Sequence, residues 1–233
     1  MPKPPHTPIE IGLDIDPDDL GQRDLYKLVC GLVVPRPIAL TTTMSVNGVV
    51  NAAPFSFFNI FSERPAVVAL GLNSKPDGSI KDTTRNIRET GEYVIHVVTQ
   101  SIAEKANVCA TEFPSDMSEI DIARFTLKPS LVVSPPTIAE APVALECRLM
   151  SITPLSPVRN IVLGEVVRIR TAPGIVDPER FHVDISAYRP VARLFGNLYA
   201  RLGELFELKR LTYSEWQDKE ATKAAKETDS VQD

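Results

Sequence analysis

The dipeptide Asn47-Gly48 is the feature that most constrains the fold of this chain. It separates two stretches of strand-like composition, PIALTTTMSV (37–46) and VVNAAPFSFF (49–58). Asn and Gly accept the positive φ angles that a two-residue primed turn requires. The sequence therefore predicts an antiparallel β-hairpin at this point.

Four more strands are predicted, at 65–73, 92–98, 142–155 and 160–171. The predicted helices are inserted between strands rather than alternating with them, so the pattern does not describe a βαβ fold. It indicates instead a mainly β protein, a six-stranded antiparallel barrel with inserted helices. Closure of the barrel is expected because it removes exposed strand edges.

Two helices are predicted from their end signals. Asp16-Pro17 supplies an N-cap and a first-turn proline for a helix that Pro35 stops. Ser79 and Asp82 match a variant of the capping box, which predicts that a second, short helix begins at Ser79. Gly91 is expected to close this second helix, because glycine favours the left-handed conformation that ends many helices.

The domain organisation is predicted from composition. Residues 1–10 are rich in proline and are expected to form an irregular arm, and residues 11–213 are expected to form one folded domain. Within it, residues 101–125 are predicted to be helical and to lie on the surface, with an interruption at Pro114. The charged tail, 214–233, has too few apolar residues to order itself, although transient helix is compatible with it.

Composition excludes several classes of function. A net charge of −5 and a pI near 5.4 argue against nucleic acid or an anionic membrane as the main partner. The sequence shows no apolar run of the roughly 18 residues that a membrane span needs, and its N-terminus lacks the apolar stretch of a secretory signal. The cysteines and histidines are dispersed: Cys30, Cys109, Cys147, His6, His96 and His182. We therefore expect a cytoplasmic protein with buried thiols and without a metal site.

The stretch VNAAPFSFFNIFSERP (50–65) indicates a flat ligand. Ala52 and Ala53 would let the backbone approach a ring closely, and the phenylalanines that follow could wall off its apolar part. The start of the predicted helix at Ser79, with Lys81 nearby, offers free N–H groups and positive charge to a phosphate. Each feature alone also fits a purely structural role, and composition does not name the ligand.

The chain resembles the flavin reductase-like family, whose fold is an FMN-binding split barrel of Greek-key type. The motifs PRPIAL, NAAPFSFF and KDTTRNI carry the resemblance in that order, and it extends through NIVLGEVVRIR and YRPVARLFGNLYARLGELFEL. The similarity covers about residues 25–208. It is strongest to the subgroup that includes flavoredoxin and the reductase components of two-component monooxygenases.

The resemblance implies a homodimer with FMN near the subunit interface. It places the isoalloxazine ring against the backbone of a segment that comprises Asn51, Ala52, Ala53, Pro54, Phe55 and Ser56. It implies ribityl and phosphate contacts from Thr42, Thr43, Lys81, Asp82 and Thr83. Arg36 is expected at the ring or the phosphate. Arg193, Asn197 and Tyr199 are expected near the pocket, from the same or the partner subunit, or else in interface packing.

The implied activity is NAD(P)H-dependent flavin reduction, in which reduced flavin serves a partner monooxygenase or passes directly to an acceptor. Hydride transfer between two stacked rings needs orientation more than it needs an acid or a base, so no catalytic side chain is predicted. Two alternatives stay open: an FMN-carrying electron-transfer protein without pyridine-nucleotide activity, and an FMN-dependent reductase of an organic substrate. The sequence does not choose between NADH and NADPH.

Overall fold

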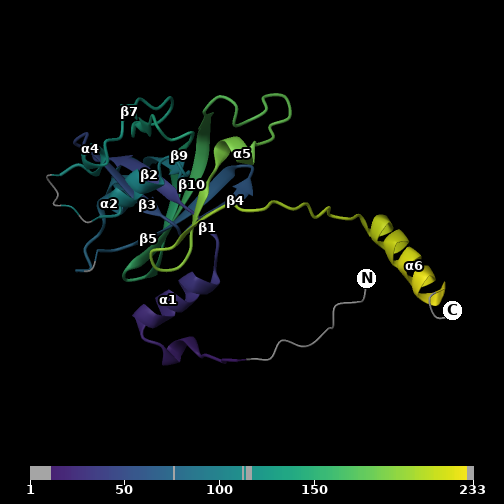
Figure 1. Cartoon of the computed structure of the whole chain (residues 1–233). Helices are drawn as coiled ribbons and strands as arrows, with labels where there is room; N and C mark the ends of the chain where they lie inside the picture. Colours follow the sequence, from purple (N-terminus) through teal and green to yellow (C-terminus); the bar gives the residue numbers. More distant parts are fainter. Residues whose placement is uncertain (1–11, 76, 112, 114–116, 230–233) are drawn as a thin grey trace. The chain divides into compact units, whose positions relative to one another are not determined.

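The computed structural model describes residues 12–75, 77–111, 113 and 117–229 (Figure 1). It divides into two compact units, one up to Leu202 and one from Gly203 onward. The strands of the first unit are β1 (Arg36–Pro37), β2 (Ala39–Met44), β3 (Val50–Phe55), β4 (Phe58–Glu63), β5 (Ala66–Asn73), β6 (Glu92–Val97), β7 (Leu127–Lys128), β8 (Thr137–Ile138), β9 (Val143–Ser156), β10 (Arg159–Thr171), β11 (Val191–Arg193) and β12 (Tyr199–Arg201). Its helices are η1 (Pro17–Asp19), α1 (Gln22–Leu32), α2 (Asp82–Thr90), α3 (Ala103–Val108), α4 (Glu119–Ile122) and α5 (Ile185–Tyr188).

The main sheet has seven strands in the order β3-β2-β6-β9-β10-β5-β4, and all neighbours are antiparallel. The predicted hairpin is confirmed as the pair β2 and β3, in which Thr42 lies opposite Ala52. The turn is longer than predicted: Gly48 donates to the carbonyl of Ser45, and of the dipeptide only Gly48 has a positive φ, of 81°. Glycine alone takes the left-handed position, so the turn is a three-residue loop rather than a two-residue primed turn.

The two edge strands of the sheet, β3 and β4, follow each other in the chain. The sheet therefore curls so that its two edges come together. Only the bend at Ser56 and Phe57 separates them. The N–H of Gly71 donates to the carbonyl of Phe57 at 2.7 Å, which ties the bend to β5. A Cβ on Gly71 would lie 2.8 Å from the Cβ of Phe57, so this approach requires glycine. We call the region of Pro54–Phe57, where the barrel is not closed by strand pairing, the split.

The barrel interior is an apolar core to which α2 contributes. Its buried members are Ala39, Phe55, Val68, Leu70, Leu72, Ile87, Tyr93, Ile95, Cys147 and Val162. Gly164 of β10 faces Tyr93 so closely that a Cβ would fall 1.8 Å from the tyrosine Oη. Gly71 and Gly164 are therefore both explained by the close approach of an aromatic side chain.

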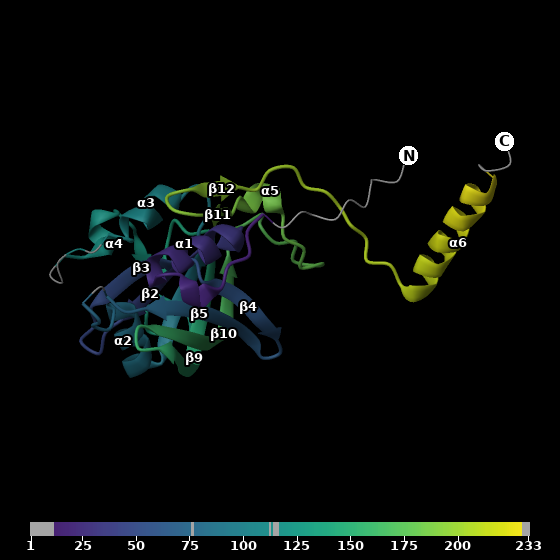
Figure 2. The same cartoon turned by 90° about the horizontal axis from the view of Figure 1, so that it is seen from below.

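A second apolar cluster lies outside the barrel, under α3 and α4, which lie beside β3 in Figure 2. Ile102, Ala106 and Ile120 are at most 3% exposed in this cluster. The helices of 101–125 therefore have one face in the core and one face exposed, as helices that lie on a surface do. Pro114 lies outside the described residues.

Two helix starts differ from the prediction. The first helical segment is two pieces, η1 and α1, because the Asp16 side chain caps only Asp18 and α1 begins after Gly21. The second helix, α2, begins at Asp82 rather than at Ser79, whose hydroxyl and N–H both bond to Asp77 instead. Gly91 closes α2 with a φ of 70°, as predicted.

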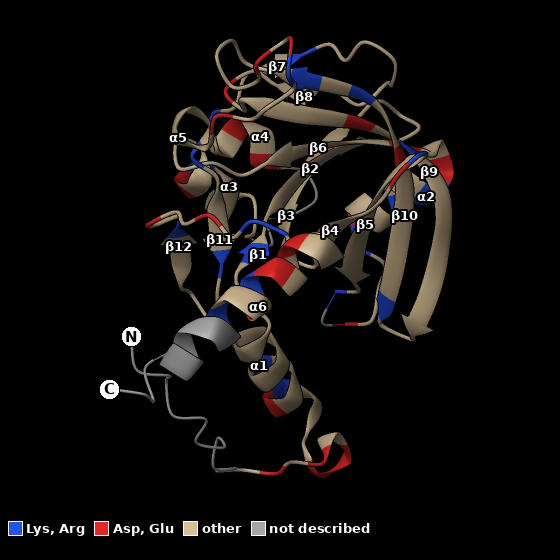
Figure 3. Ribbon diagram, turned by 90° about the vertical axis from the view of Figure 1, so that its right-hand side faces the viewer, with Lys and Arg blue, Asp and Glu red and all other residues tan. Residues whose placement is uncertain are grey.

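Strands β1, β11 and β12 form a small antiparallel sheet next to the split, with Arg36 opposite Arg193 and Arg193 opposite Tyr199. Figure 3 shows basic colouring on β1 and β11. The second unit contains the helix α6 (Tyr213–Asp229). Among the described residues, no helix is both long enough and apolar enough to cross a membrane.

Candidate functional site

Three cavities meet at Pro54, which lines all of them. The α2 cavity, of about 460 Å³, lies between β3 and the start of α2. The β11 cavity, of about 600 Å³, lies between α1, the split and β11. The α1 cavity, of about 450 Å³, lies between α1, the split and the paired ends of β5 and β10. The stretch singled out in the sequence is therefore the common wall of one composite site.

The α2 cavity brings together most of the residues expected at a phosphate. Its lining includes Asn51, Ala53, Pro54, Phe55, Lys75, Lys81, Asp82, Thr83, Cys109 and Glu119. No described side chain caps the N-terminus of α2, so its first N–H groups are available. Asp82 is held by Lys75 at 3.4 Å and by Arg85 at 2.7 Å, and Lys81 has no ion pair among the described residues. The cavity therefore offers a helix dipole and a lysine charge to an anion.

The hydroxyls of the Thr41–Thr43 run differ in their roles. Thr43 of β2 accepts from Asn86 of α2 at 3.0 Å, and Asn51 of β3 donates to Thr83 at 2.9 Å, so these bonds attach both strands to α2. Thr42 points to the other face of the sheet and donates to the carbonyl of Pro136 at 2.7 Å. Thr42 and Thr43 are both fully buried. Neither Thr42 nor Thr43 lines the α2 cavity; both support the strands and the helix that form its wall.

Ala52 and Ala53 face opposite sides of β3, as neighbours in a strand must. Ala52 is fully buried in the cluster under α3 and α4, whereas Ala53 lines the α2 cavity. Because β3 is an edge strand of the main sheet, backbone groups on its outer edge are not used by a strand neighbour. Small side chains at this edge keep the backbone accessible to a flat ligand.

Glu119 and Cys109 line the α2 cavity and were not singled out in the sequence. Burial raises the pKa of the Glu119 carboxyl, although backbone hydrogen bonds of Glu119 and Ala52 oppose the shift. Burial, with the charge of Glu119, raises the pKa of the Cys109 thiol to about 12, so that thiol is unreactive. Lys75 is a further lining residue that the sequence reasoning missed. Only its place before α2 could have indicated it.

The β11 cavity gathers the remaining predicted residues: Arg36, Ser56, Arg193, Asn197 and Tyr199. Arg36 is nearly buried, and its guanidinium donates to the carbonyls of Cys30, Val33 and Leu194 at 2.5–2.6 Å. These bonds tie the end of α1 to β11, so Arg36 serves as a structural clamp whose charge borders the cavity.

Arg193 lies over the ring of Tyr199, with 4.6 Å from the guanidinium carbon to the ring centroid. It also donates to the carbonyl of Gly196, and the Tyr199 hydroxyl donates to Asn107 at 3.0 Å. Asn197 is exposed at the rim. The late motif is therefore close to Pro54 within one subunit, with Arg193 and Tyr199 held in a fixed pair.

Known proteins resemble this chain over most of its length. The family model for the flavin reductase like domain matches residues 31–218. The chain belongs to this family. It is 41% identical over 208 aligned residues to an uncharacterized protein of Halalkalibacterium halodurans, and the match covers 87% of this chain and 99% of that protein.

Solved structures agree with this assignment. Nitrilotriacetate monooxygenase component B from Bacillus cereus is 36% identical, with a TM-score of 0.82, over 85% of this chain and 100% of that one. The 2-nitrobenzoate 2-nitroreductase NbaA of Pseudomonas fluorescens is 34% identical, with a TM-score of 0.79, over 86% and 98%. The predicted family and its mainly β split-barrel fold are both confirmed.

Family membership implies flavin binding, and the described residues fit a flavin. The α2 cavity combines an anion-binding end at Lys81 with an apolar wall at Pro54 and Phe55. The uncapped helix start suits a phosphate, and the edge of β3 suits a ring whose heteroatoms seek backbone partners.

Proposed function

We propose that this protein is an FMN-binding, NAD(P)H-dependent flavin reductase. The observation that carries the proposal is that the α2 cavity shares Pro54 as a lining residue with two neighbouring cavities. A ligand in the α2 cavity and a second ligand in a neighbouring cavity would therefore both contact Pro54. A reductase of this kind needs such a shared wall, because its two planar reactants must stack.

FMN is preferred to riboflavin in this proposal because the α2 cavity ends at a charged anion site. Lys81 and the free N–H groups of α2 would hold the phosphate, and Thr83 stands in the first turn. Ala53 and Pro54 would lie against the ring. When bound, the flavin would supply the chemistry by accepting a hydride and passing electrons on. The chain itself binds and orients, so no proton-transfer residue is assigned.

The test is anaerobic mixing of the flavin-loaded protein with NADH and with NADPH, while the visible absorption band of the flavin is followed. Bleaching by either nucleotide is the expected result. If neither bleaches the band although FMN binds, the protein is an electron carrier or uses another reductant, and the reductase proposal falls.

A second candidate function is reduction of an organic substrate by the bound flavin. It is favoured by the 34% identity to a protein named as a 2-nitrobenzoate 2-nitroreductase. The β11 cavity, with Arg36, Arg193 and an apolar rim of Leu194 and Phe195, would suit an aromatic carboxylate. Nucleotide oxidation that accelerates on adding 2-nitrobenzoate without oxygen would favour it over simple flavin reduction.

We also propose that the protein acts as a homodimer and supplies reduced flavin to a partner monooxygenase. The dimer is supported by exposed apolar side chains on α1 and β4, among them Leu32 at 72% and Phe61 at 68% exposure. The monooxygenase partner is supported by the similarity to a monooxygenase component B. Light scattering on the purified protein should give twice the mass of one chain.

A further inference from the structure

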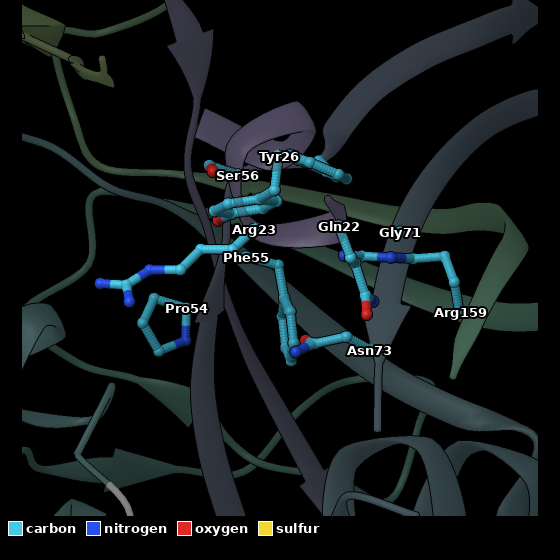
Figure 4. Close-up of a pocket in the computed structure, with 10 residues that line it drawn as sticks. Gln22, Arg23, Tyr26, Pro54, Phe55, Ser56, Gly71, Asn73 and Arg159 are labelled. Carbon is cyan, nitrogen blue, oxygen red and sulfur yellow. The ribbon is translucent and has the colours of Figure 1, made fainter. Parts of the chain in front are cut away.

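The α1 cavity is not used by the proposed flavin site, and its composition is distinctive. It is lined by Gln22, Arg23, Tyr26, Pro54, Phe55, Ser56, Phe57, Gly71, Asn73 and Arg159 (Figure 4). The described lining contains two arginines and no acidic residue. It therefore has the charge of an anion site and lies directly beside the cavity assigned to FMN.

The position of Arg159 is fixed by the barrel. It lies opposite Asn73 across the β10–β5 pair, so the two side chains share one face of the sheet. Its guanidinium carbon lies 4.9 Å from the centroid of the Phe57 ring. Phe57 reaches that place only because Gly71 lacks a side chain. Arg159 is half-buried, and the described residues include no carboxylate that forms an ion pair with it.

Helix α1 contributes the other side of the cavity. Arg23 has no ion pair among the described residues, and the neighbouring Asp24 is paired with Lys27 at 2.9 Å. Figure 4 shows Arg23 and Arg159 on opposite sides of the view, with Phe55 and Asn73 between them. Tyr26 is 54% exposed and its ring tilts toward Phe57, with 6.3 Å between ring centroids. An exposed aromatic ring beside two free guanidinium groups offers stacking together with phosphate binding.

We propose that the α1 cavity binds the adenosine 2′-phosphate end of the hydride donor, so that the protein uses NADPH in preference to NADH. This inference rests on the proposed function. Arginine without a carboxylate accommodates a 2′-phosphate, whereas a carboxylate at the ribose favours the free 2′-hydroxyl and repels phosphate. With the adenosine here, the nicotinamide end would reach the shared wall at Pro54, where the flavin ring is placed.

Binding is tested first, without any reduction. Adenosine 2′,5′-bisphosphate and adenosine 5′-phosphate are titrated calorimetrically into the FMN-loaded protein. The bisphosphate should bind at least about tenfold more tightly, because charge-assisted bonds to one more phosphate each contribute about a factor of ten. The Arg23→Gln/Arg159→Gln variant should lose this preference. The control variant Arg168→Gln/Arg180→Gln removes two exposed arginines outside this cavity and should keep it.

Steady-state kinetics are then measured with both nucleotides. Wild type should show a higher kcat/KM with NADPH, and the double variant should lose about tenfold or more of this value while NADH is little affected. Equal binding of the two adenosine phosphates, or a preference that survives in the double variant, overturns the proposal. If neither nucleotide reduces the flavin, the proposed function fails, and the calorimetric preference alone then supports or overturns the adenosine site.

Discussion

The closed side of the barrel, strands β6, β9 and β10, and the split at Pro54–Phe57 treat polar groups in opposite ways. On the closed side, His96 and Glu146 are fully buried and satisfied: His96 contacts Leu40 and Ile138, and Glu146 accepts from two backbone N–H groups. At the split, an uncapped helix start and arginines without acidic partners face cavities. The partners of His96 and Glu146 thus mark structural roles, although the Oη of Tyr93 on the same side has none, and the unused donors at the split are available for binding.

The contrast predicts that a change on the closed side affects the stability of the fold, whereas a change at the split affects affinity. Gly164→Ala should have the largest effect, because its Cβ would fall 1.8 Å from the Oη of fully buried Tyr93. We expect a loss of about 3 kcal/mol in the free energy of unfolding and a fall in Tm of roughly 6–10 °C. Gly203→Ala is the control, since nothing lies within 4 Å of its added Cβ. An unchanged Tm for Gly164→Ala would contradict the packing described.

The second effect is a pH dependence from His96. Burial lowers the pKa of His96 to about 4, although its hydrogen bond to the Leu40 carbonyl opposes the shift. The unfolded chain has the ordinary value of about 6.5, so below that pH the unfolded state binds the proton first and stability falls until about pH 4. Between pH 6.5 and pH 5 the loss is about 2 kcal/mol, because each pH unit in this range costs about 1.4 kcal/mol.

Urea unfolding at pH 7, 6 and 5 measures this slope. The His96→Gln variant should be less stable at pH 7 and should lack the contribution of His96 to the slope. His182→Gln, at an exposed position, should retain it. A wild-type stability that does not fall between pH 6.5 and 5 would show that His96 is protonated in the fold.

The third prediction separates two adjacent alanines. Ala53→Val should weaken FMN binding about tenfold with little change in stability, because the added methyls enter the α2 cavity. Ala52→Val should instead lower the free energy of unfolding by about 1–3 kcal/mol, because Ala52 is fully buried in the cluster under α3 and α4. Flavin titration and urea unfolding of both variants check this. If both variants changed the FMN affinity equally, the flavin ring would not lie against Ala53.

The fourth prediction concerns the charged end of the α2 cavity. Lys81→Ala should lower the affinity for FMN about five- to tenfold, because one charge-assisted contact to phosphate is lost. Riboflavin, which has no phosphate, should bind the variant nearly as well as wild type. Lys128→Ala, at an exposed position outside this cavity, is the control. Equal losses of affinity for both flavins would show that the phosphate does not bind at the start of α2.

The sequence predicted the hairpin and the two long strands because their signals are local: a turn glycine and alternating β-branched residues. It missed β4 because VNAAPFSFFNIF reads as one continuous stretch, and only the close approach of Phe57 to Gly71 breaks it in two. It also missed the cavities beside Pro54. They arise from residues of α1, β10 and α4 that only the fold brings to the split.

Helix caps also show what sequence patterns alone do not decide. Ser79 and Asp82 fit a capping pattern, but Ser79 bonds to Asp77, so the start of α2 stays free. Thr212 and Glu215 form the reciprocal bonds of a capping box, with Thr212 N–H to Glu215 at 2.8 Å and Glu215 N–H to Thr212 at 3.3 Å. The pattern TYSE was present in the sequence, and it begins a helix in a charged tail for which at most transient helix was expected.

The smallest effect is expected from removing that tail. Deletion of residues 214–233 should leave the FMN content and the FMN affinity unchanged, because every residue that lines the three cavities belongs to the first unit. The Tyr213–Trp216 ring stack and the capping box are contacts within the second unit, so the helix α6 does not need the barrel for them. Flavin absorbance per chain after desalting measures the outcome. A colourless truncated protein would show that the tail completes the binding site.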